Sequence, residues 1–202
     1  MIVYVETNFL LELAYLQERW SRCEEILRLA KTGAIRLVVP AFCIAEARAT
    51  SHRRASERQE FHVLLQKHIR EISRSEPFRG LSEQSRDVVA ALVAGGEESR
   101  ERLEAAIRAI ETDGEVIPLS SAIIMVARVH ELLYSLSPQD SLVLESVRSH
   151  AEKEPGPKCF VTQDAKGFAN PSVYDELAKT ECKVLVNFAD AAAYIHKNLR
   201  SN

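Results

Sequence analysis

Four acidic residues occupy positions from which their carboxylates can meet. The four are Glu6, Glu46, Asp140 and Asp164. Glu6 and Asp164 follow short apolar runs that are typical of buried strands. Asp140 falls in the first turn of an expected helix, and Glu46 falls about one and a half turns into another. Ligands bind a parallel α/β sheet outside the carboxyl ends of its strands, and the helices that follow those strands begin at the same edge. The spacing therefore predicts that the four carboxylates converge there.

Converging carboxylates repel one another, so either some of them stay protonated or divalent cations neutralise them. Ligand sets made only of oxygen suit Mg²⁺ or Mn²⁺, and such ions usually assist phosphoryl chemistry. Single members of the set have a simpler interpretation. Asp140 is an acid that the helix dipole favours, and Glu46 is one of many solvated helical glutamates. The set is preferred because two of its members end strands.

The elements that must position these acids alternate between strands and helices at both ends of the chain. Apolar, β-branched runs predict strands over residues 2–5, 35–39, 116–117, 159–162 and 183–186. Capping and stop residues predict helices over residues 9–16, 21–31, 41–75, 82–94, 97–112, 120–133, 139–150, 173–179 and 188–199. Thr7 or Asn8 is expected to cap the first helix, and Gly95-Gly96 to separate two later ones.

This alternation predicts a parallel sheet covered by helices. We expect a single α/β domain over residues 1–202, with a helical insertion from about residue 50 to residue 113. The insertion is unevenly charged. Residues 48–79 hold eight Lys or Arg against four acids, whereas residues 80–115 hold nine acids against four Arg. The basic part leads away from Glu46. It is interpreted either as a track for an RNA backbone or as an ordinary solvated helix with internal ion pairs.

The composition is typical of a folded, soluble protein. The chain has 26 Lys and Arg against 29 Asp and Glu, and 46% of its residues are hydrophobic, a balance that argues against disorder. No apolar run approaches the roughly 18 residues of a membrane helix. The first residues lack the basic segment of a secretory signal. We therefore expect a cytoplasmic location, no membrane partner and four free cysteines.

Motifs of several other protein classes are absent. There is no G-x-G-x-x-G, no G-x-x-x-x-G-K-[ST] and no G-x-S-x-G. Nothing therefore indicates a dinucleotide, a P-loop nucleotide or a serine hydrolase site. His52, His62 and His68 are spaced by ten and six residues, which does not place them well on one helix face. A zinc site in this stretch is not expected.

Four segments resemble the motifs of PIN-domain ribonucleases, the fold of many bacterial toxin nucleases and RNA-processing enzymes. The segments are V-E-T-N-F-L-L-E-L at 5–13, V-V-P-A-F-C-I-A-E-A at 38–47, S-P-Q-D-S-L-V-L-E-S-V at 137–147 and F-V-T-Q-D-A-K-G-F at 160–168. The resemblance covers roughly residues 1–50 and 135–190. It departs from the family in its first acid, which is normally Asp but here is Glu6, and in the insertion.

The resemblance implies an α/β/α sandwich that hydrolyses RNA to products with a 5′-phosphate and a 3′-hydroxyl. In this interpretation Mg²⁺ or Mn²⁺ is the cofactor, and an antitoxin-like protein and a second copy of the chain are partners. The catalytic and metal-binding residues are then Glu6, Glu46, Asp140 and Asp164, and the supporting residues are Asn8, Thr162 and Lys166. The supporting residues have simpler roles too, as a helix cap, a strand-end hydrogen-bonding group and a solvated lysine.

Two alternative functions remain. One is a PIN-like module that has lost its chemistry and binds RNA or protein. The extra methylene of Glu6 keeps this alternative open, because Mg²⁺ tolerates misplaced ligands poorly. The other is a metal-dependent DNA nuclease or phosphoesterase on a similar sheet.

Overall fold

A five-stranded parallel sheet forms the centre of the protein. The computed structural model describes residues 1–164 and 167–200, with the side chains of residues 81 and 82 outside the description. The strands are β1 (Ile2–Val5), β2 (Arg36–Pro40), β3 (Glu115–Ile117), β4 (Lys158–Val161) and β5 (Cys182–Leu185), and their spatial order is β3-β2-β1-β4-β5. Val3 pairs with Leu37 on one side and with Cys159 on the other. The predicted parallel sheet is confirmed, and all its carboxyl ends lie at one edge.

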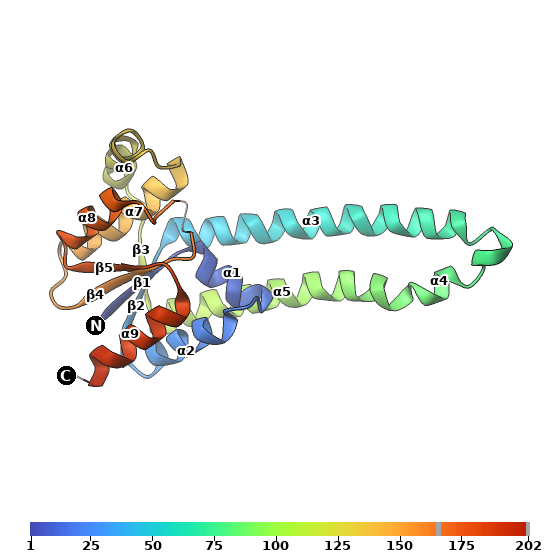
Figure 1. Cartoon of the computed structure of the whole chain (residues 1–202), viewed down its shortest axis with the longest axis horizontal. Coiled ribbons are helices and arrows are strands. Elements are labelled where there is room, and N and C mark those ends of the chain that lie inside the picture. Colours follow the sequence, from blue (N-terminus) through green and yellow to red (C-terminus); the bar gives the residue numbers. More distant parts are fainter. Residues whose placement is uncertain (165–166, 201–202) are drawn as a thin grey trace.

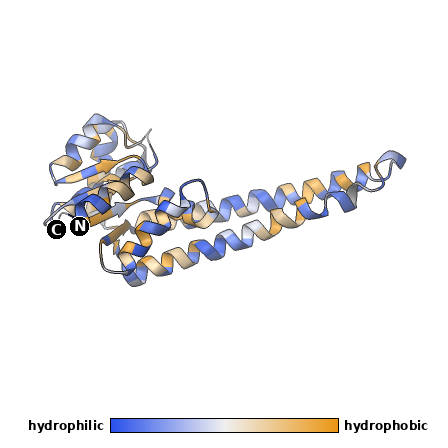
Figure 2. Cartoon of the chain, turned by 60° about the horizontal axis from the view of Figure 1, so that its bottom comes forward, coloured by the Kyte–Doolittle hydropathy of each residue, from blue (hydrophilic) through white to orange (hydrophobic). Residues whose placement is uncertain are grey.

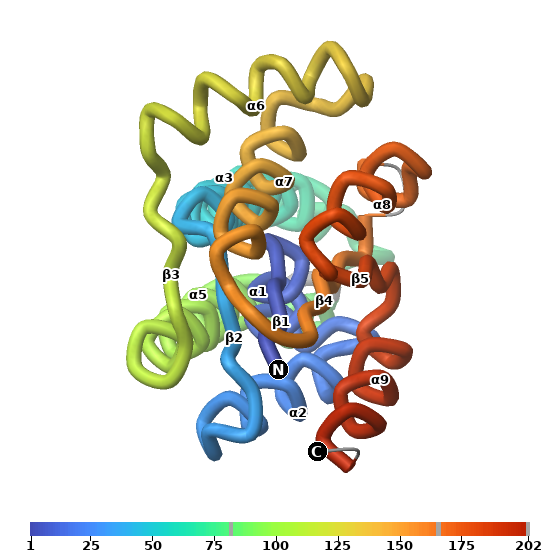
Figure 3. Tube along the Cα trace, turned by 90° about the vertical axis from the view of Figure 1, so that its left-hand side faces the viewer, coloured from blue at the N-terminus to red at the C-terminus, as the bar shows by residue number. Residues whose placement is uncertain are grey.

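Helices cover both faces of the sheet, which completes the expected α/β/α sandwich (Figure 3). One face carries α1 (Thr7–Tyr15), α2 (Trp20–Lys31) and α9 (Phe188–Arg200). The other face carries α7 (Pro138–Ala151) and α8 (Pro171–Ala178). Helix α6 (Ser121–Tyr134) lies outside this layer and packs on α7. Among the described residues, no helix is long and apolar enough to cross a membrane.

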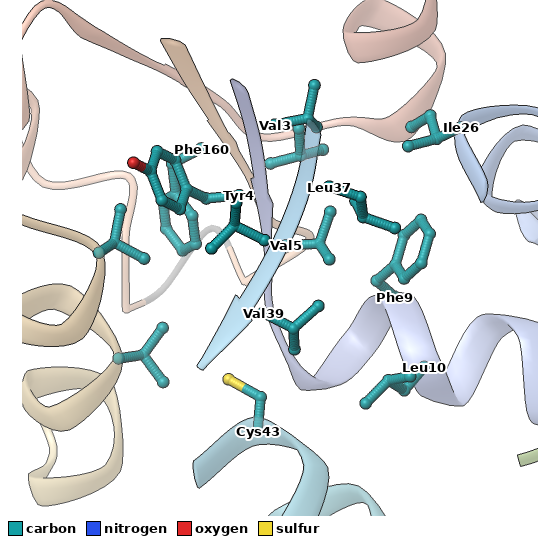
Figure 4. Packing of buried hydrophobic residues seen from close by; sticks show 14 of the residues in the cluster. Val3, Tyr4, Val5, Phe9, Leu10, Ile26, Leu37, Val39, Cys43 and Phe160 are labelled. Atoms are coloured by element: carbon teal, nitrogen blue, oxygen red, sulfur yellow. The ribbon is translucent and has the colours of Figure 1, made fainter. Parts of the chain in front are cut away.

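The sheet is apolar on both faces, which explains why its central strands read as continuous hydrophobic runs. In β1, the side chain of Tyr4 lies beside Phe160 on one face (Figure 4). Val5 points to the opposite face and lies with Leu37 close to Phe9 of α1. All five of these side chains are fully buried. The alternation of strand side chains thus fixes the start of α1 against the sheet, immediately after Glu6.

Two long helices form an arm that projects away from the sheet (Figure 1). They are α3 (Ala41–Ile72) and α5 (Arg86–Asp113), joined through a 3₁₀ turn (Glu76–Phe78) and the short α4 (Leu81–Gln84). The outer half of the arm mixes hydrophobic and hydrophilic residues along its length (Figure 2). The root of the arm packs against the body, because α5 contacts α1, α2 and β2.

The expected break at Gly95-Gly96 is wrong, because α5 runs through both glycines. A glycine costs a helix only about 1 kcal/mol relative to alanine. Here the helix is also held by packing after the pair, where Ser99, Leu103 and Ala106 are buried. Ser99 Oγ donates a hydrogen bond to the carbonyl of Gly95. Tertiary packing therefore overrides the local stop signal.

Candidate functional site

Glu6 lies at the carboxyl end of β1 and joins two elements through its side chain. It is the N-cap of α1, and its Oε2 accepts a hydrogen bond of 2.8 Å from the backbone N–H of Asn8. The expected capping side chains, Thr7 and Asn8, do not cap this helix. On the other side, Oε1 accepts from the hydroxyl of Thr162 at 3.2 Å and from the backbone N–H of Gln163 at 3.3 Å. The longer glutamate side chain thus bridges the start of α1 and the end of β4.

The carboxyl group of Glu6 is almost fully buried, with 4% of the residue exposed. Burial in a medium of low polarity disfavours the charged form and raises the pKa of Glu6 to about 7. Hydrogen bonds from Asn8, Gln163 and Thr162 oppose this rise but do not cancel it. Glu6 therefore sits close to its titration point at neutral pH when no cation is bound.

Thr162 connects Glu6 with the second acid of the set. Its hydroxyl donates to Glu6 and accepts a hydrogen bond of 2.9 Å from the backbone N–H of Asp164. Thr162 is fully buried and directly follows β4, one residue beyond the last residue of the strand. Asp164 Oδ1 then accepts from the backbone N–H of Gly167 at 3.0 Å. The loop after β4 is thereby folded around the carboxylate of Asp164.

Asp140 and Asp164 approach each other at Gly167. A Cβ atom on Gly167 would lie 2.8 Å from Asp140 Oδ2 and 2.9 Å from Asp164 Oδ2. The two carboxylate oxygens therefore face one point and lie no more than about 6 Å apart. Burial and the negative charge of Asp164 raise the pKa of Asp140 above its usual range. These two acids are brought together, although 23 residues and a strand separate them in the chain.

The helix α7 fixes Asp140 through its N-cap. Ser137 Oγ accepts from the backbone N–H of Asp140 at 3.1 Å and donates to Asp140 Oδ2 at 2.7 Å. Pro138 occupies the first helical turn, where its missing N–H costs nothing. The predicted start of this helix at Ser137-Pro138 is therefore confirmed. The carboxylate is held at the helix N-terminus, where the dipole favours negative charge.

Glu46 lies on α3 and is connected to the other acids through a residue of α1. Its Oε2 accepts a hydrogen bond from the hydroxyl of Thr7, the residue that follows Glu6. Glu46 is half-buried. The four acids consequently belong to two groups of contacts, which are connected because Glu6 and Thr7 are neighbours in the chain. One joins Glu6, Thr162 and Asp164 and continues to Asp140, and the other joins Thr7 and Glu46.

The four carboxylates do not form a ready-made metal cage. Within residues 1–164 and 167–200, no group of three or more His, Cys, Asp or Glu side chains lies close enough to hold a metal ion as it stands. The oxygens of Glu6 are engaged by the three hydrogen bonds described above, and Glu46 faces Thr7. Lys166, predicted to contact phosphate, lies outside the described residues. Asp140 and Asp164 are the pair that shares one space.

Comparison with known proteins identifies the family. The family model described as the PIN domain matches residues 3–168. The chain belongs to the PIN-domain family. Among solved structures, the crystal structure of VapBC2 from Rickettsia felis bound to a DNA fragment from their promoter aligns with 92% of this chain and 98% of that chain, at 14% identity and a TM-score of 0.45. No curated protein matches this chain.

Membership confirms the resemblance based on the four motifs. The matched range contains all four acids and the arm. PIN domains are generally nucleases, and they generally use divalent metal ions. In this PIN domain the donor set fits such a cation, since every candidate ligand offers carboxylate oxygen. The close approach of Asp140 and Asp164 beside Gly167 favours a cation as well, because the repulsion between two neighbouring carboxylates is relieved when a cation binds near them.

Sequence reasoning assigned no role to Gly167 or Thr7 within the PIN motifs. Gly167 stands three residues after Asp164, and a glycine beside a candidate ligand can signal close approach of the backbone. Nothing in the sequence indicates that the carboxylate of Asp140 fills the space beside it. Thr7 carries a hydroxyl next to Glu6, but its partner, Glu46, is 39 residues away.

Substitution of Gly167 tests how tightly the PIN domain holds this acid pair. Gly167→Ala would place a methyl group within 2.9 Å of oxygens of both Asp140 and Asp164, closer than non-bonded contacts allow. We expect the two carboxylates to be pushed apart and nuclease activity to fall at least about tenfold, since site geometry tolerates little displacement. Initial cleavage rates would be compared with those of Gly96→Ala, because a Cβ atom on Gly96 of α5 would meet no heavy atom within 4 Å. Equal rates for the wild-type protein and Gly167→Ala would contradict the close approach.

Proposed function

We propose that this PIN domain is a divalent-metal-dependent ribonuclease that hydrolyses the phosphodiester bonds of RNA. The observation that supports it most is the convergence of Asp140 and Asp164 at Gly167, at the carboxyl edge of a parallel sheet. Ligands bind open α/β sheets at this edge. Glu6 is tied to the same loop through Thr162, and Glu46 approaches through Thr7.

In this proposal Asp140 and Asp164 hold the cation, with Glu6 and Glu46 completing the acidic set around it. When bound, a divalent cation supplies a water of lowered pKa and stabilises negative charge that develops on the phosphate. Ser137 keeps the carboxylate of Asp140 in place through its hydroxyl. Thr162 orients both Glu6 and Asp164, because one hydroxyl serves both residues. Asn8 contributes its backbone N–H to the carboxylate of Glu6.

The test compares RNA and DNA strands of the same sequence, each labelled at its 5′ end. The wild-type protein is incubated with Mn²⁺, with Mg²⁺ and with EDTA, beside an Asp140→Asn variant. We expect cleavage of RNA with Mn²⁺ or Mg²⁺ only, with product ends that ligase accepts as 5′-phosphate and 3′-hydroxyl. Cleavage in EDTA, or cleavage by both proteins alike, would contradict the proposal.

Two alternatives are outcomes of the same experiment. If the wild-type protein binds RNA but leaves it intact under every condition, the chain is a PIN domain that binds without chemistry. The observation that favours this alternative is that three hydrogen bonds already occupy both oxygens of Glu6, which would otherwise be free to bind a cation. If DNA alone is cut, the chain is a DNA nuclease.

We also propose that a second copy of the chain covers the outer face of α6. Leu132, Leu133 and Met125 are 86%, 65% and 63% exposed on this helix. Arg128 and Glu131 border these side chains, and neither forms an ion pair within the part of the chain that the structure describes. In an antiparallel pair of α6 helices centred between residues 129 and 130, Arg128 of each copy lies opposite Glu131 of the other. A self-complementary face is the requirement of a two-fold dimer.

Light scattering tests this dimer. We expect the wild-type protein to have twice the mass of one chain at micromolar concentration. We expect Leu132→Glu to be monomeric and still folded, because Leu132 is exposed in the single chain. Val63→Glu, which changes an apolar residue of the arm that is 60% exposed, serves as the matched control. A monomeric wild-type protein would exclude the interface.

A toxin role restrained by an antitoxin-like protein is the finer form of the proposed function. It rests on PIN-family membership and on the nuclease chemistry proposed above. Expression of the wild-type chain alone in bacteria is expected to arrest growth, whereas expression of Asp140→Asn is not. Equal growth of both cultures would contradict a toxin role and leave the nuclease assay unaffected.

A further inference from the structure

Helices α1 and α3 both begin at the acidic site and meet again farther out. Near the site they are joined by Thr7 and Glu46. At the end of α1, two arginines of α3 lie over the ring of Tyr15, with Cζ of Arg54 4.7 Å and Cζ of Arg58 5.3 Å from the ring centroid. All three of these side chains are half-buried. The seam between α1 and α3 thus leads from carboxylates at one end to two guanidinium groups at the other.

The two guanidinium groups keep their positive charge available. Within residues 1–164 and 167–200, no ion pair joins Arg54 or Arg58 to a carboxylate. Their neighbours on α3 differ, because Arg48 pairs with Glu104 at 3.0 Å and Arg53 pairs with Glu57 at 3.0 Å. The contact with Tyr15 holds Arg54 and Arg58 through the ring face, which is a cation–π interaction. A guanidinium held in this way still directs N–H donors from its edge.

Such a pair is suited to phosphate. The planar fork of arginine donates two parallel hydrogen bonds to phosphate oxygens, and a guanidinium held in advance loses less rotamer entropy on binding. The acidic site itself repels a polyanion unless cations fill it, so a nuclease requires cationic contacts outside the site. Arg54 and Arg58 are eight and twelve residues after Glu46, which is about 12 Å and 18 Å along a helix. At roughly 3.4 Å for each stacked nucleotide, that is about three to five nucleotides.

We propose that Arg54 and Arg58, stacked on Tyr15, form a phosphate clamp for single-stranded RNA about three to five nucleotides from the acidic site. The proposal rests on the proposed ribonuclease function for the identity of the strand. It differs from a general attraction between RNA and the basic half of the arm. In the clamp, most of the RNA affinity comes from two arginines that are preorganised by one aromatic ring. The solvated cations farther out, such as Lys67 and Arg70, contribute little.

The experiment measures RNA binding without cleavage. All proteins carry Asp140→Asn, and binding of a 12-nucleotide, fluorescein-labelled, unstructured RNA is followed by anisotropy from low to moderate salt. One variant adds Arg54→Gln and Arg58→Gln, which remove two charges and keep most of each side chain. The control adds Lys67→Gln and Arg70→Gln, which remove the same charge from the same helix. Thermal melting confirms that each variant is folded.

We expect the Arg54 and Arg58 variant to raise the Kd about tenfold or more, and to lower the slope of log K against log salt by about 1.4, which corresponds to two phosphate contacts on a single strand. The control is expected to change the Kd less than about threefold. Tyr15→Leu is expected to weaken binding while most of the salt slope remains, because the charges stay and only their support is lost. Equal effects of the two double substitutions, or no effect of the Arg54 and Arg58 pair, would overturn the clamp.

The failure of the clamp and the failure of the ribonuclease can be told apart. If the wild-type protein cuts RNA, and the Arg54 and Arg58 pair affects neither binding nor the KM of cleavage, the clamp alone is wrong. If the wild-type protein cuts no RNA under any condition, but the binding pattern is as expected, the clamp stands and the proposed enzyme is wrong. An enzyme with the clamp is expected to show a raised KM and a nearly unchanged kcat when both arginines are replaced.

Discussion

Replacing Asp140 with asparagine is expected to lower RNA cleavage at least about 100-fold while the protein stays folded. Loss of a group that merely supports a metal ligand costs 10- to 100-fold, so loss of a ligand charge is expected to reach or exceed the upper value. The fold is expected to tolerate the change, because the side-chain oxygen of asparagine still accepts the hydrogen bond from Ser137. Initial rates with saturating Mn²⁺ measure the effect.

The matched control for this substitution is Asp190→Asn. Asp190 is an exposed acid in the first turn of α9, as Asp140 is in the first turn of α7. The Asp190→Asn control therefore removes the same charge from the same kind of helix position, on α9 instead of α7. In EDTA, the free energy of unfolding of both variants is expected to lie within about 1 kcal/mol of that of the wild-type protein. Mn²⁺ is expected to raise the melting temperature of the wild-type protein and of Asp190→Asn, but much less that of Asp140→Asn. A similar loss of activity in both variants would contradict the assignment of Asp140 as a metal ligand.

Replacing Glu6 with glutamine is expected to stabilise the metal-free protein at pH 8 and to impair cleavage. Burial raises the pKa of Glu6 from 4.5 to about 7, so the folded protein binds a proton more tightly than the unfolded chain. The penalty for ionising this group is absent below pH 4.5, grows as the pH rises to about 7, and is complete above it. A shift of this size corresponds to about 3 kcal/mol. Glutamine avoids the penalty, but it has one acceptor oxygen where Glu6 has two. It therefore cannot accept from Asn8 and also from Thr162 and Gln163, and the lost acceptor costs about 1 kcal/mol.

The net gain at pH 8 is therefore about 2 kcal/mol, and it changes to a small loss at pH 4.5. Urea unfolding in EDTA at both pH values measures the difference. Glu24→Gln, an exposed position on α2, is expected to show no such pH dependence. If Glu6→Gln were less stable than the wild-type protein at pH 8, the carboxyl of Glu6 would not carry the ionisation penalty. A gain in stability together with lost cleavage is the expected behaviour of a residue kept for function.

The sequence predicted much of the sheet and of the helical layers because both follow from local patterns. The run Ile2–Val5 is apolar throughout, and the structure buries it on both faces. Ser137-Pro138 combines a preferred N-cap residue with a proline suited to the first helical position, and α7 begins there. The failure at Gly95-Gly96 has the opposite cause. Packing of Ser99 and Leu103 against distant elements holds α5 together, and a local pattern does not contain such contacts.

The candidate site could be predicted only as a set of residues. The position of each acid after a strand or within the first turns of a helix is local information, and it predicts that all four lie near one edge of the sheet. The contacts between them are not local. Glu6 reaches Thr162 across 156 residues, and Glu46 meets Thr7 rather than the other acids. Such choices depend on side-chain directions in the packed fold, which spacing alone does not encode.

The uninterrupted course of α3 makes the arm a lever whose short end carries Glu46. The helix has 32 residues and spans about 48 Å. Glu46 lies near its start, and Ile72 ends it close to the tip of the arm. Because the helix is continuous over this length, a tilt of five degrees about its start moves its far end by roughly 4 Å and Glu46 by only about 0.7 Å. A contact at the tip of the arm therefore acts on the same helix that carries a carboxylate of the site, about 39 Å away.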